Sequence, residues 1–190
     1  MHHIPNIISA LRILLVLPIA HQLLHAEWKN ALILIFVAGI SDAIDGFLAR
    51  NYKWQSKLGG FLDPLADKLL LTVVFVTLAY KDIIPNWLAI LVISRDLIIL
   101  LGAIVYHWVT RELRMTPILI SKINTTMQIT FVLALMYHLA INPMTEPVLN
   151  ILKYGVAITT LLSGIMYVIH WSRYTIKYLS KKQHNKNGAI

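Results

Sequence analysis

The sequence contains no cysteine and few charged residues. Of its 190 residues, 14% are Asp, Glu, Lys or Arg, against about 25% in an average soluble domain. Without cysteine the chain forms no disulfide bond and has no thiol nucleophile. It also has no sequence repeat and no low-complexity segment. With 57% hydrophobic residues, this composition predicts a polytopic membrane protein of one domain.

Acidic residues are the scarcer charge. The sequence has nine Asp and Glu residues and seventeen Lys and Arg residues, which gives a formal net charge of +8. In a membrane protein such an excess points to topology and to anionic lipid before nucleic acid. We therefore expect membrane lipid, and no nucleic acid, among the partners.

Six apolar stretches of about 20 residues are each long enough to cross a bilayer. They cover residues 4–25, 31–50, 61–80, 84–108, 122–141 and 148–172. The first has no basic segment before it and no A-x-A site after it, so we expect it to be retained and not cleaved as a signal peptide. The expected fold is an all-α integral membrane protein with six transmembrane helices around a cytoplasm-facing polar active site. Residues 1–172 form the transmembrane domain, and residues 173–190 form a basic tail that is either solvated or a helix on an anionic surface.

Basic residues are distributed unequally between the two predicted membrane sides. Three lie on one side: Lys29, Lys81 and Lys153. Eleven lie on the other: Arg50, Lys53, Lys57, Arg111, Arg114, Lys122, Arg173, Lys177, Lys181, Lys182 and Lys186. The positive-inside rule places this second side, with both termini, in the cytoplasm.

Four aspartates occupy the cytoplasmic ends of the second and third stretches: Asp42, Asp45, Asp63 and Asp67. A charge at the centre of a membrane helix costs roughly 2.5–3.5 kcal/mol on insertion scales, so four unpaired charges would cost about 10–14 kcal/mol. That cost is comparable with the whole stability of a typical domain, and a divalent cation is the natural compensation.

The spacing of residues 42–67 predicts that the four carboxylates lie close together. At about 100° per residue, the positions sharing a helix face are Asp42, Asp45, Gly46 and Ala49 in one stretch and Gly59, Asp63 and Asp67 in the next. Two helices joined by a short loop lie antiparallel, so the two faces meet across one gap.

The whole segment reads D-x2-D-G-x2-A-R-x8-G-x3-D-x3-D. It resembles the signature of the CDP-alcohol phosphotransferase family, with every defined position matched. The family transfers a phospho-alcohol group from a CDP-alcohol to an acceptor hydroxyl and releases CMP. By this resemblance, Asp42, Asp45 and Asp63 bind two divalent cations, Mg²⁺ or Mn²⁺, and Asp67 is a further ligand or the base that takes the acceptor proton. The CDP-binding residues implied are Asn6, Gly46, Ala49, Arg50 and Gly59.

Further polar residues lie within the apolar stretches. Asn6, Ser9 and Arg12 share a face that could turn toward the carboxylates, although Asn6 and Ser9 could instead cap the first helix. Arg95 carries five fixed donors and suits phosphate, or it forms a structural pair with Asp96. Lys68 is expected to pair structurally.

The segment from Ser121 to Gln128 reads S-K-I-N-T-T-M-Q. It resembles the S-K-x-N-T-x2-Q segment of the cardiolipin synthase branch, which uses a CDP-activated lipid. The resemblance implies CDP-diacylglycerol as donor and phosphatidylglycerol as acceptor. Phosphatidylglycerophosphate synthases, which use glycerol 3-phosphate, more often have a second Lys at the position of Asn124, and one cation fewer favours the singly charged acceptor. The acceptor-binding candidates are Arg12, Arg95, Arg114, Lys122 and Asn124.

Two other classes of function remain as alternatives. A divalent-cation channel or transporter would be expected to show acidic rings, repeats or discontinuous helices, and none is evident. A purely structural membrane subunit would use polar residues as helix-to-helix contacts, usually Ser, Thr or Asn. The family resemblance further implies a homodimer, in a bacterial or mitochondrial inner membrane.

Overall fold

The computed structural model describes the backbone of residues 4–52, 59–110 and 119–187, and side chains within 11–41, 68–102, 104, 119–170 and 172. The described residues form helices and turns, with no strand among them. The six helices are α1 (Ile4–Leu24), α2 (Trp28–Tyr52), α3 (Gly59–Tyr80), α4 (Asn86–Thr110), α5 (Leu119–Ala140) and α6 (Glu146–Asn187). Each corresponds to one apolar stretch of the sequence, so the all-helical prediction is confirmed.

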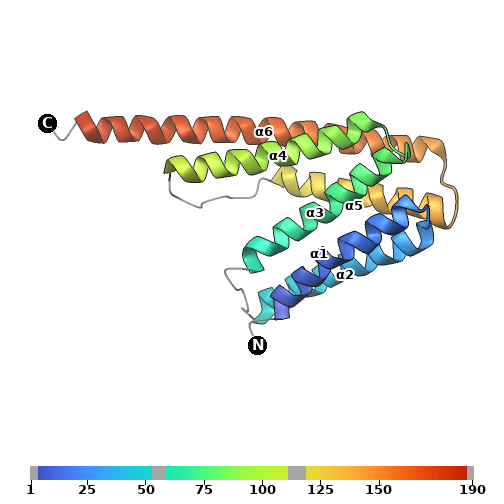
Figure 1. Ribbon diagram of the computed structural model, residues 1–190. Helices are drawn as coiled ribbons and strands as arrows, with labels where there is room; N and C mark the ends of the chain where they lie inside the picture. The colour runs from blue at the N-terminus through green and yellow to red at the C-terminus, as the bar shows by residue number, and fades with distance from the viewer. Residues whose placement is uncertain (1–3, 53–58, 111–118, 188–190) are drawn as a thin grey trace.

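The largest difference from expectation is the length of α6. The sixth apolar stretch ends near residue 172, but the helix continues to Asn187 and has 42 residues in all. The backbone of the basic tail is therefore helical. Figure 1 shows α6 extending well past the ends of its neighbours.

The helices form two groups, α1–α3 and α4–α6 (Figure 1). In the first group α1 packs against α2 and α3, and in the second α6 packs against α4 and α5. Contacts between the groups join α2 to α5, α3 to α4 and α3 to α5. The connections 25–27, 81–85 and 141–145 lie at one end, called here the turn end. The motif end is the opposite one, where α2 and α4 finish and α3 and α5 begin, and the groups separate toward it.

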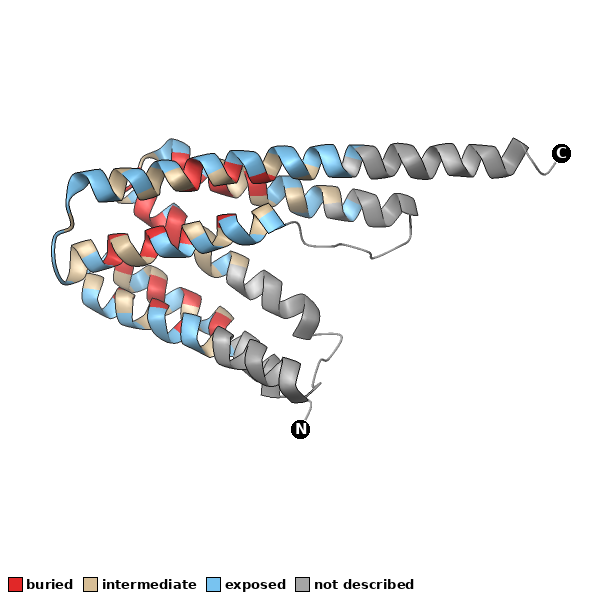
Figure 2. Cartoon of the chain, turned by 180° about the vertical axis from the view of Figure 1, so that it is seen from behind, coloured by how far each residue is buried: buried red, intermediate tan, exposed pale blue. Residues whose placement is uncertain are grey.

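A continuous apolar core occupies the half of the molecule nearest the turn end. All six helices contribute, with buried residues such as Leu23, Ala31, Leu78, Leu88 and Met136. Their positions follow from helical periodicity, since each helix turns one apolar stripe inward. The rings of Phe75 on α3 and Phe131 on α5 lie 6.3 Å apart and join the two groups. Figure 2 shows the buried residues within the bundle and exposed ones along its outer faces.

The outer surface of the bundle is also apolar. Leu17 is 72% exposed, Ile90 65% and Ile151 71%. Exposed apolar surface of this extent indicates a membrane or a protein partner. Among the described residues, two helical segments are long and apolar enough to cross a membrane, Leu119–Ala140 and Glu146–His170.

Two of the turns end their helices in the same way without glycine. Ala26 and Asp82 have positive φ angles of 59° and 56°. After α1, the Glu27 amide donates to the Gln22 carbonyl and the Ala26 amide to the Leu23 carbonyl, and α3 ends with the equivalent pair of bonds. This is the Schellman arrangement, which satisfies the last carbonyl groups of a helix.

Candidate active site

The four motif aspartates and the buried polar residues lie at overlapping depths in the bundle. Asp42 and Asp45 belong to α2, and Asp63 and Asp67 to α3. At 1.5 Å per residue, all four positions are roughly 20–25 Å from the turn end along their helices. By the same measure, Arg12, Lys68, Arg95 and Asn124 are roughly 14–24 Å from the turn end on α1, α3, α4 and α5. The bundle thus has an apolar layer near the turn end and a polar layer one to three turns further along.

The chemistry of the motif fits a hard divalent cation. Four carboxylates supply the oxygen ligands that Mg²⁺ and Mn²⁺ prefer. Their side chains lie outside the described ones, as do those of the other motif residues, Gly46, Ala49, Arg50 and Gly59. Among the side chains that are described, no cluster of three His, Asp or Glu could hold a metal ion.

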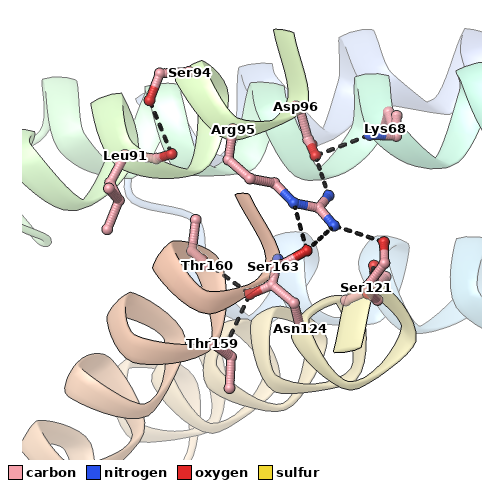
Figure 3. A network of polar contacts seen from close by, with 11 residues as sticks. Lys68, Leu91, Ser94, Arg95, Asp96, Ser121, Asn124, Thr159, Thr160 and Ser163 are labelled. Carbon is pink, nitrogen blue, oxygen red and sulfur yellow. Dashed lines mark hydrogen bonds and ion pairs between the residues drawn. The ribbon is translucent and has the colours of Figure 1, made fainter. Parts of the chain in front are cut away.

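Arg95 is the centre of the polar layer (Figure 3). It is 5% exposed. Its Nε donates to Ser163 Oγ at 3.1 Å, and its Nη2 donates to Ser163 Oγ and Ser121 Oγ, both at 2.6 Å. Its Nη1 donates to Asp96 Oδ1 at 2.5 Å. Of the two interpretations of Arg95, the structure contains the pair with Asp96, and the acceptor-binding role stays a prediction.

Asp96 in turn joins α4 to α3. Lys68 Nζ donates to Asp96 Oδ1 at 2.8 Å, so one carboxylate oxygen accepts from both Lys68 and Arg95. The expected structural pairing of Lys68 is confirmed. Because Arg95 also binds Ser121 on α5 and Ser163 on α6, this network connects four helices (Figure 3).

Asn124 was predicted to bind the acceptor, but the structure places its side chain in the interior of the bundle. It has no exposed surface, and its Oδ1 accepts hydrogen bonds from the hydroxyls of Thr159 and Thr160, both at 2.9 Å. These contacts make Asn124 a link between α5 and α6. Lys122, two residues earlier, is exposed on the surface of α5, so it is the acceptor candidate on this helix that a solute can reach.

Two amide donors of the polar layer have no hydrogen-bond partner among the described residues. They are Asn124 Nδ2 and Gln128 Nε2, and both side chains are at least 98% buried. A buried amide donor without a partner costs about 1–3 kcal/mol. The polar layer therefore contains two buried donors that are not satisfied by the described residues.

Two adjoining cavities follow the seam between α2 and α5. The first, of about 400 Å³, is lined by Arg12, Gly39 and Thr125 among apolar side chains. The second, of about 730 Å³, continues toward the turn end as far as Tyr137 and Met144. Both cavities are lined by Phe36 and Leu133. Together they form one apolar groove, called here the α2–α5 groove.

The groove leads from the turn end toward the motif. From Thr125 to Tyr137 it follows α5 for about 18 Å at 1.5 Å per residue. Gly39 lines the part of the groove nearest the motif end. It precedes Asp42 by three residues and Gly46 by seven, so the three positions share one face of α2. A Cβ atom added to Gly39 would meet nothing within 4 Å, which leaves the groove open at this point.

The hydroxyl residues of α6 were missed by the sequence reasoning. Thr159, Thr160 and Ser163 all bind polar side chains of other helices. A signal was present, because Gly155, Thr159 and Ser163 recur at steps of four, and small residues at this spacing allow membrane helices to approach closely. At Gly155 an added Cβ would lie 2.7 Å from the Met127 side chain of α5.

The remaining predicted site residues divide into two sets. Arg12 is 1% exposed and lines the α2–α5 groove, which places it between the first group and α5. The side chain of Asn6, on α1, and the whole of Arg114 lie outside the described residues. The roles predicted for those two residues stay predictions.

Comparison with known sequences identifies the family. A family model described as CDP-alcohol phosphatidyltransferase matches residues 2–172. The chain belongs to the CDP-alcohol phosphatidyltransferase family, which confirms the resemblance found in the motif.

The individual relatives belong to two branches of that family. The chain is 34% identical over 195 residues to a cardiolipin synthase (CMP-forming) of Rattus norvegicus, an alignment of 94% of this chain and 64% of that protein. It is 34% identical over 192 residues to the Homo sapiens protein of the same name, covering 93% and 64%. A Bacillus subtilis CDP-diacylglycerol–glycerol-3-phosphate 3-phosphatidyltransferase is 33% identical over 136 residues, covering 71% and 69%. The chain thus spans about two-thirds of the length of these relatives.

Proposed function

We propose that this protein transfers the phosphatidyl group of CDP-diacylglycerol to a hydroxyl of phosphatidylglycerol, forming cardiolipin and CMP. The observation that carries the proposal is the similarity to cardiolipin synthases over 94% of the chain, a stretch that contains the complete aspartate motif. The family alone fixes only the CDP-alcohol chemistry, and the named relatives supply the donor and acceptor.

The motif residues perform the transfer as follows. Asp67 accepts the proton of the acceptor hydroxyl, and the hydroxyl oxygen attacks the phosphorus that carries diacylglycerol. The bond from this phosphorus to the bridging oxygen breaks, and CMP departs with the electron pair. Gly46, Ala49 and Gly59 leave space for the cytidine because they have little or no side chain. Arg50 holds the nucleotide or its phosphates.

Asp42, Asp45, Asp63 and Asp67 would hold two divalent cations, Mg²⁺ or Mn²⁺. When bound, such cations neutralise the charge that develops on the phosphate oxygens. The position of the four residues within two predicted membrane-spanning segments supports this assignment, since unpaired carboxylates in such segments would be costly.

The α2–α5 groove is the proposed site of one acyl chain of the donor. Its length of about 18 Å is close to the roughly 15 Å that one leaflet contributes to the hydrocarbon core. Its lining is mostly apolar. Gly39, which lines it, shares a face of α2 with Gly46, the residue proposed to leave space for the cytidine. A chain lying there would place its phosphates beside the motif.

The proposal includes six membrane-spanning helices, with both termini and the motif end in the cytoplasm and with residues 173–190 as a separate basic tail. The apolar outer surface of the helices supports the crossings, and the distribution of Lys and Arg supports the orientation. A bacterial or mitochondrial inner membrane and a homodimeric assembly complete the proposal.

Glycerol 3-phosphate is the second candidate acceptor, with phosphatidylglycerophosphate as product. The similarity to the Bacillus subtilis enzyme supports it. A dianionic acceptor would be expected to use Arg114 and Lys122 together.

The deciding experiment measures CMP release by purified protein with CDP-diacylglycerol, Mg²⁺ or Mn²⁺, and each acceptor in turn. We expect phosphatidylglycerol to support turnover and glycerol 3-phosphate to support little. The reverse preference would replace the first function by the second. A chain that releases CMP with neither acceptor would contradict both.

A further inference from the structure

The bond between Lys68 and Asp96 crosses from one helix group to the other. Lys68 belongs to α3, in the group that carries the whole aspartate motif. Asp96 belongs to α4, in the group that carries the exposed acceptor candidate Lys122. The bond lies in the polar layer, on the side where the two groups separate toward the motif end (Figures 1 and 3).

The Asp96 end of this bond is held firmly by its own group. Asp96 accepts from Arg95, and Arg95 donates to Ser121 on α5 and to Ser163 on α6. Three helices therefore fix the position of one carboxylate. Lys68 directly follows Asp67 in the chain, so a shift of α3 that moves one of them moves the other.

The bond is poorly placed to serve stability alone. The Lys68 side chain is 42% exposed and that of Asp96 is 16% exposed. Asp96 also accepts from Arg95, so the loss of Lys68 would leave no unpaired carboxylate. The apolar layer between the bond and the turn end already joins α3 to α4 and α5.

We infer that Lys68 and Asp96 are positioning residues for the transfer reaction: their bond sets α3, and with it Asp63 and Asp67, relative to α4–α6. The inference rests on the proposed function, in which the cations and the CDP part of the donor bind to the first group and the acceptor approaches from the second. Reacting atoms must be held at about 3–3.5 Å, and a displacement of about 1 Å can cost on the order of 100-fold in rate. A contact that fixes the separation of the two groups therefore acts on kcat, while cation binding within the first group is unaffected.

The kinetic test uses Lys68→Met, with Lys68→Arg as the conservative replacement. For Lys68→Met we expect kcat to fall roughly 10- to 100-fold, with the affinity for Mn²⁺ within about twofold of wild type and an unchanged melting temperature. Lys68→Arg keeps the charge and should retain most of the rate. Lys153→Met is the matched control, because among the described residues Lys153 bonds only within α6, to Asn150 at 2.7 Å. The kcat of this variant should equal that of wild type.

A double variant tests whether the two residues act as a pair. Lys68→Met combined with Asp96→Asn should lower kcat no further than Asp96→Asn alone, because the second substitution removes a bond that is already broken. Multiplicative losses would mean that the residues act separately, and would overturn the inference. It would also be overturned by a wild-type kcat in Lys68→Met, or by a loss of rate matched by a loss of Mn²⁺ affinity.

A distance measurement tests the same contact without activity. The chain has no cysteine, so Leu14→Cys on α1 and Leu101→Cys on α4, at sites 66% and 59% exposed, can carry the only two spin labels. In lipid nanodiscs, Lys68→Met should shift or broaden the distance distribution between the labels, and Lys153→Met should not. An unchanged distribution in Lys68→Met would refute the positioning role. An altered distribution in a protein that releases no CMP with either acceptor would leave the contact standing and refute the proposed function.

Discussion

The two ends of this helical bundle hold together by different means. At the turn end, three short connections and an apolar core join all six helices. Toward the motif end, the described contacts between helices include directional bonds of Arg95, Asp96 and Asn124. Apolar packing tolerates small changes of shape, whereas a hydrogen bond requires its partner at one distance and angle.

Because of this difference, we expect the turn end to determine the stability of the fold and the motif end to determine its activity. The apolar layer stabilises the fold and carries no reactive group. The polar layer contains two buried amide donors, Asn124 Nδ2 and Gln128 Nε2, that have no hydrogen-bond partner among the described residues. Such donors make it less stable than an apolar layer of the same size. Substitutions at the motif end should therefore change activity with little effect on folding, and substitutions at the turn end should do the opposite.

The largest expected effect comes from removing one motif carboxylate. Asp42→Asn should lower turnover on the order of 1,000-fold, equivalent to about 4 kcal/mol of transition-state stabilisation, because it removes one charged ligand from a shared cation site. The thermal unfolding midpoint should stay within a few degrees of wild type. Asp45→Asn and Asp63→Asn should behave alike, and EDTA should abolish wild-type turnover. Retained activity after EDTA treatment would show that the aspartates serve another purpose.

A smaller effect is expected from partly filling the α2–α5 groove. Gly39→Leu places an apolar side chain where nothing lies within 4 Å of the new Cβ atom, so folding should be unaffected. Displacing about two methylenes of an acyl chain, at roughly 0.8 kcal/mol each, should raise the KM for CDP-diacylglycerol about tenfold. Gly39→Ala is the graded control and should change KM less than twofold. An unchanged KM in the Leu variant would place the acyl chain elsewhere.

The smallest effect belongs to the turn end. Ala26 holds a φ of 59°, a conformation that glycine adopts without strain. Ala26→Gly should stabilise the folded state by up to about 1 kcal/mol, measured by unfolding in mild detergent, and should leave kcat and KM unchanged. Lower stability, or a change in turnover, would show that the two ends are coupled more closely than their contacts indicate.

The sequence predicted the helices well because each is marked by its own apolar stretch. Polar breaks such as His25–Lys29 and Lys81–Asp82 placed the turns within a few residues. The extension of α6 was harder to predict, because residues 173–187 are polar and hydropathy does not distinguish a solvated helix from a solvated coil.

Within the polar layer, residue types were easier to predict than their partners. Arg95 was identified as a residue that needs phosphate or an ion pair, since a guanidinium in an apolar stretch must be compensated. The sequence could not choose between these two, because Ser121 and Ser163 come close to it only through the packing of α4 against α5 and α6. The burial of Asn124 likewise depends on which face of α5 meets Thr159 and Thr160.

The unbroken α6 has a consequence for the basic tail. Forty-two residues in one helix give a rod about 63 Å long, whereas a bilayer with its headgroups is about 40–45 Å thick. A steeply crossing α6 would project roughly 20 Å into the water, further than the Debye length of about 8 Å at physiological salt. Lys186 would then lie beyond the reach of the lipid charge, and Lys181 and Lys182 would lie near its limit. The positive charge at the end of α6 would then act on anionic solutes in the water more than on the lipid headgroups.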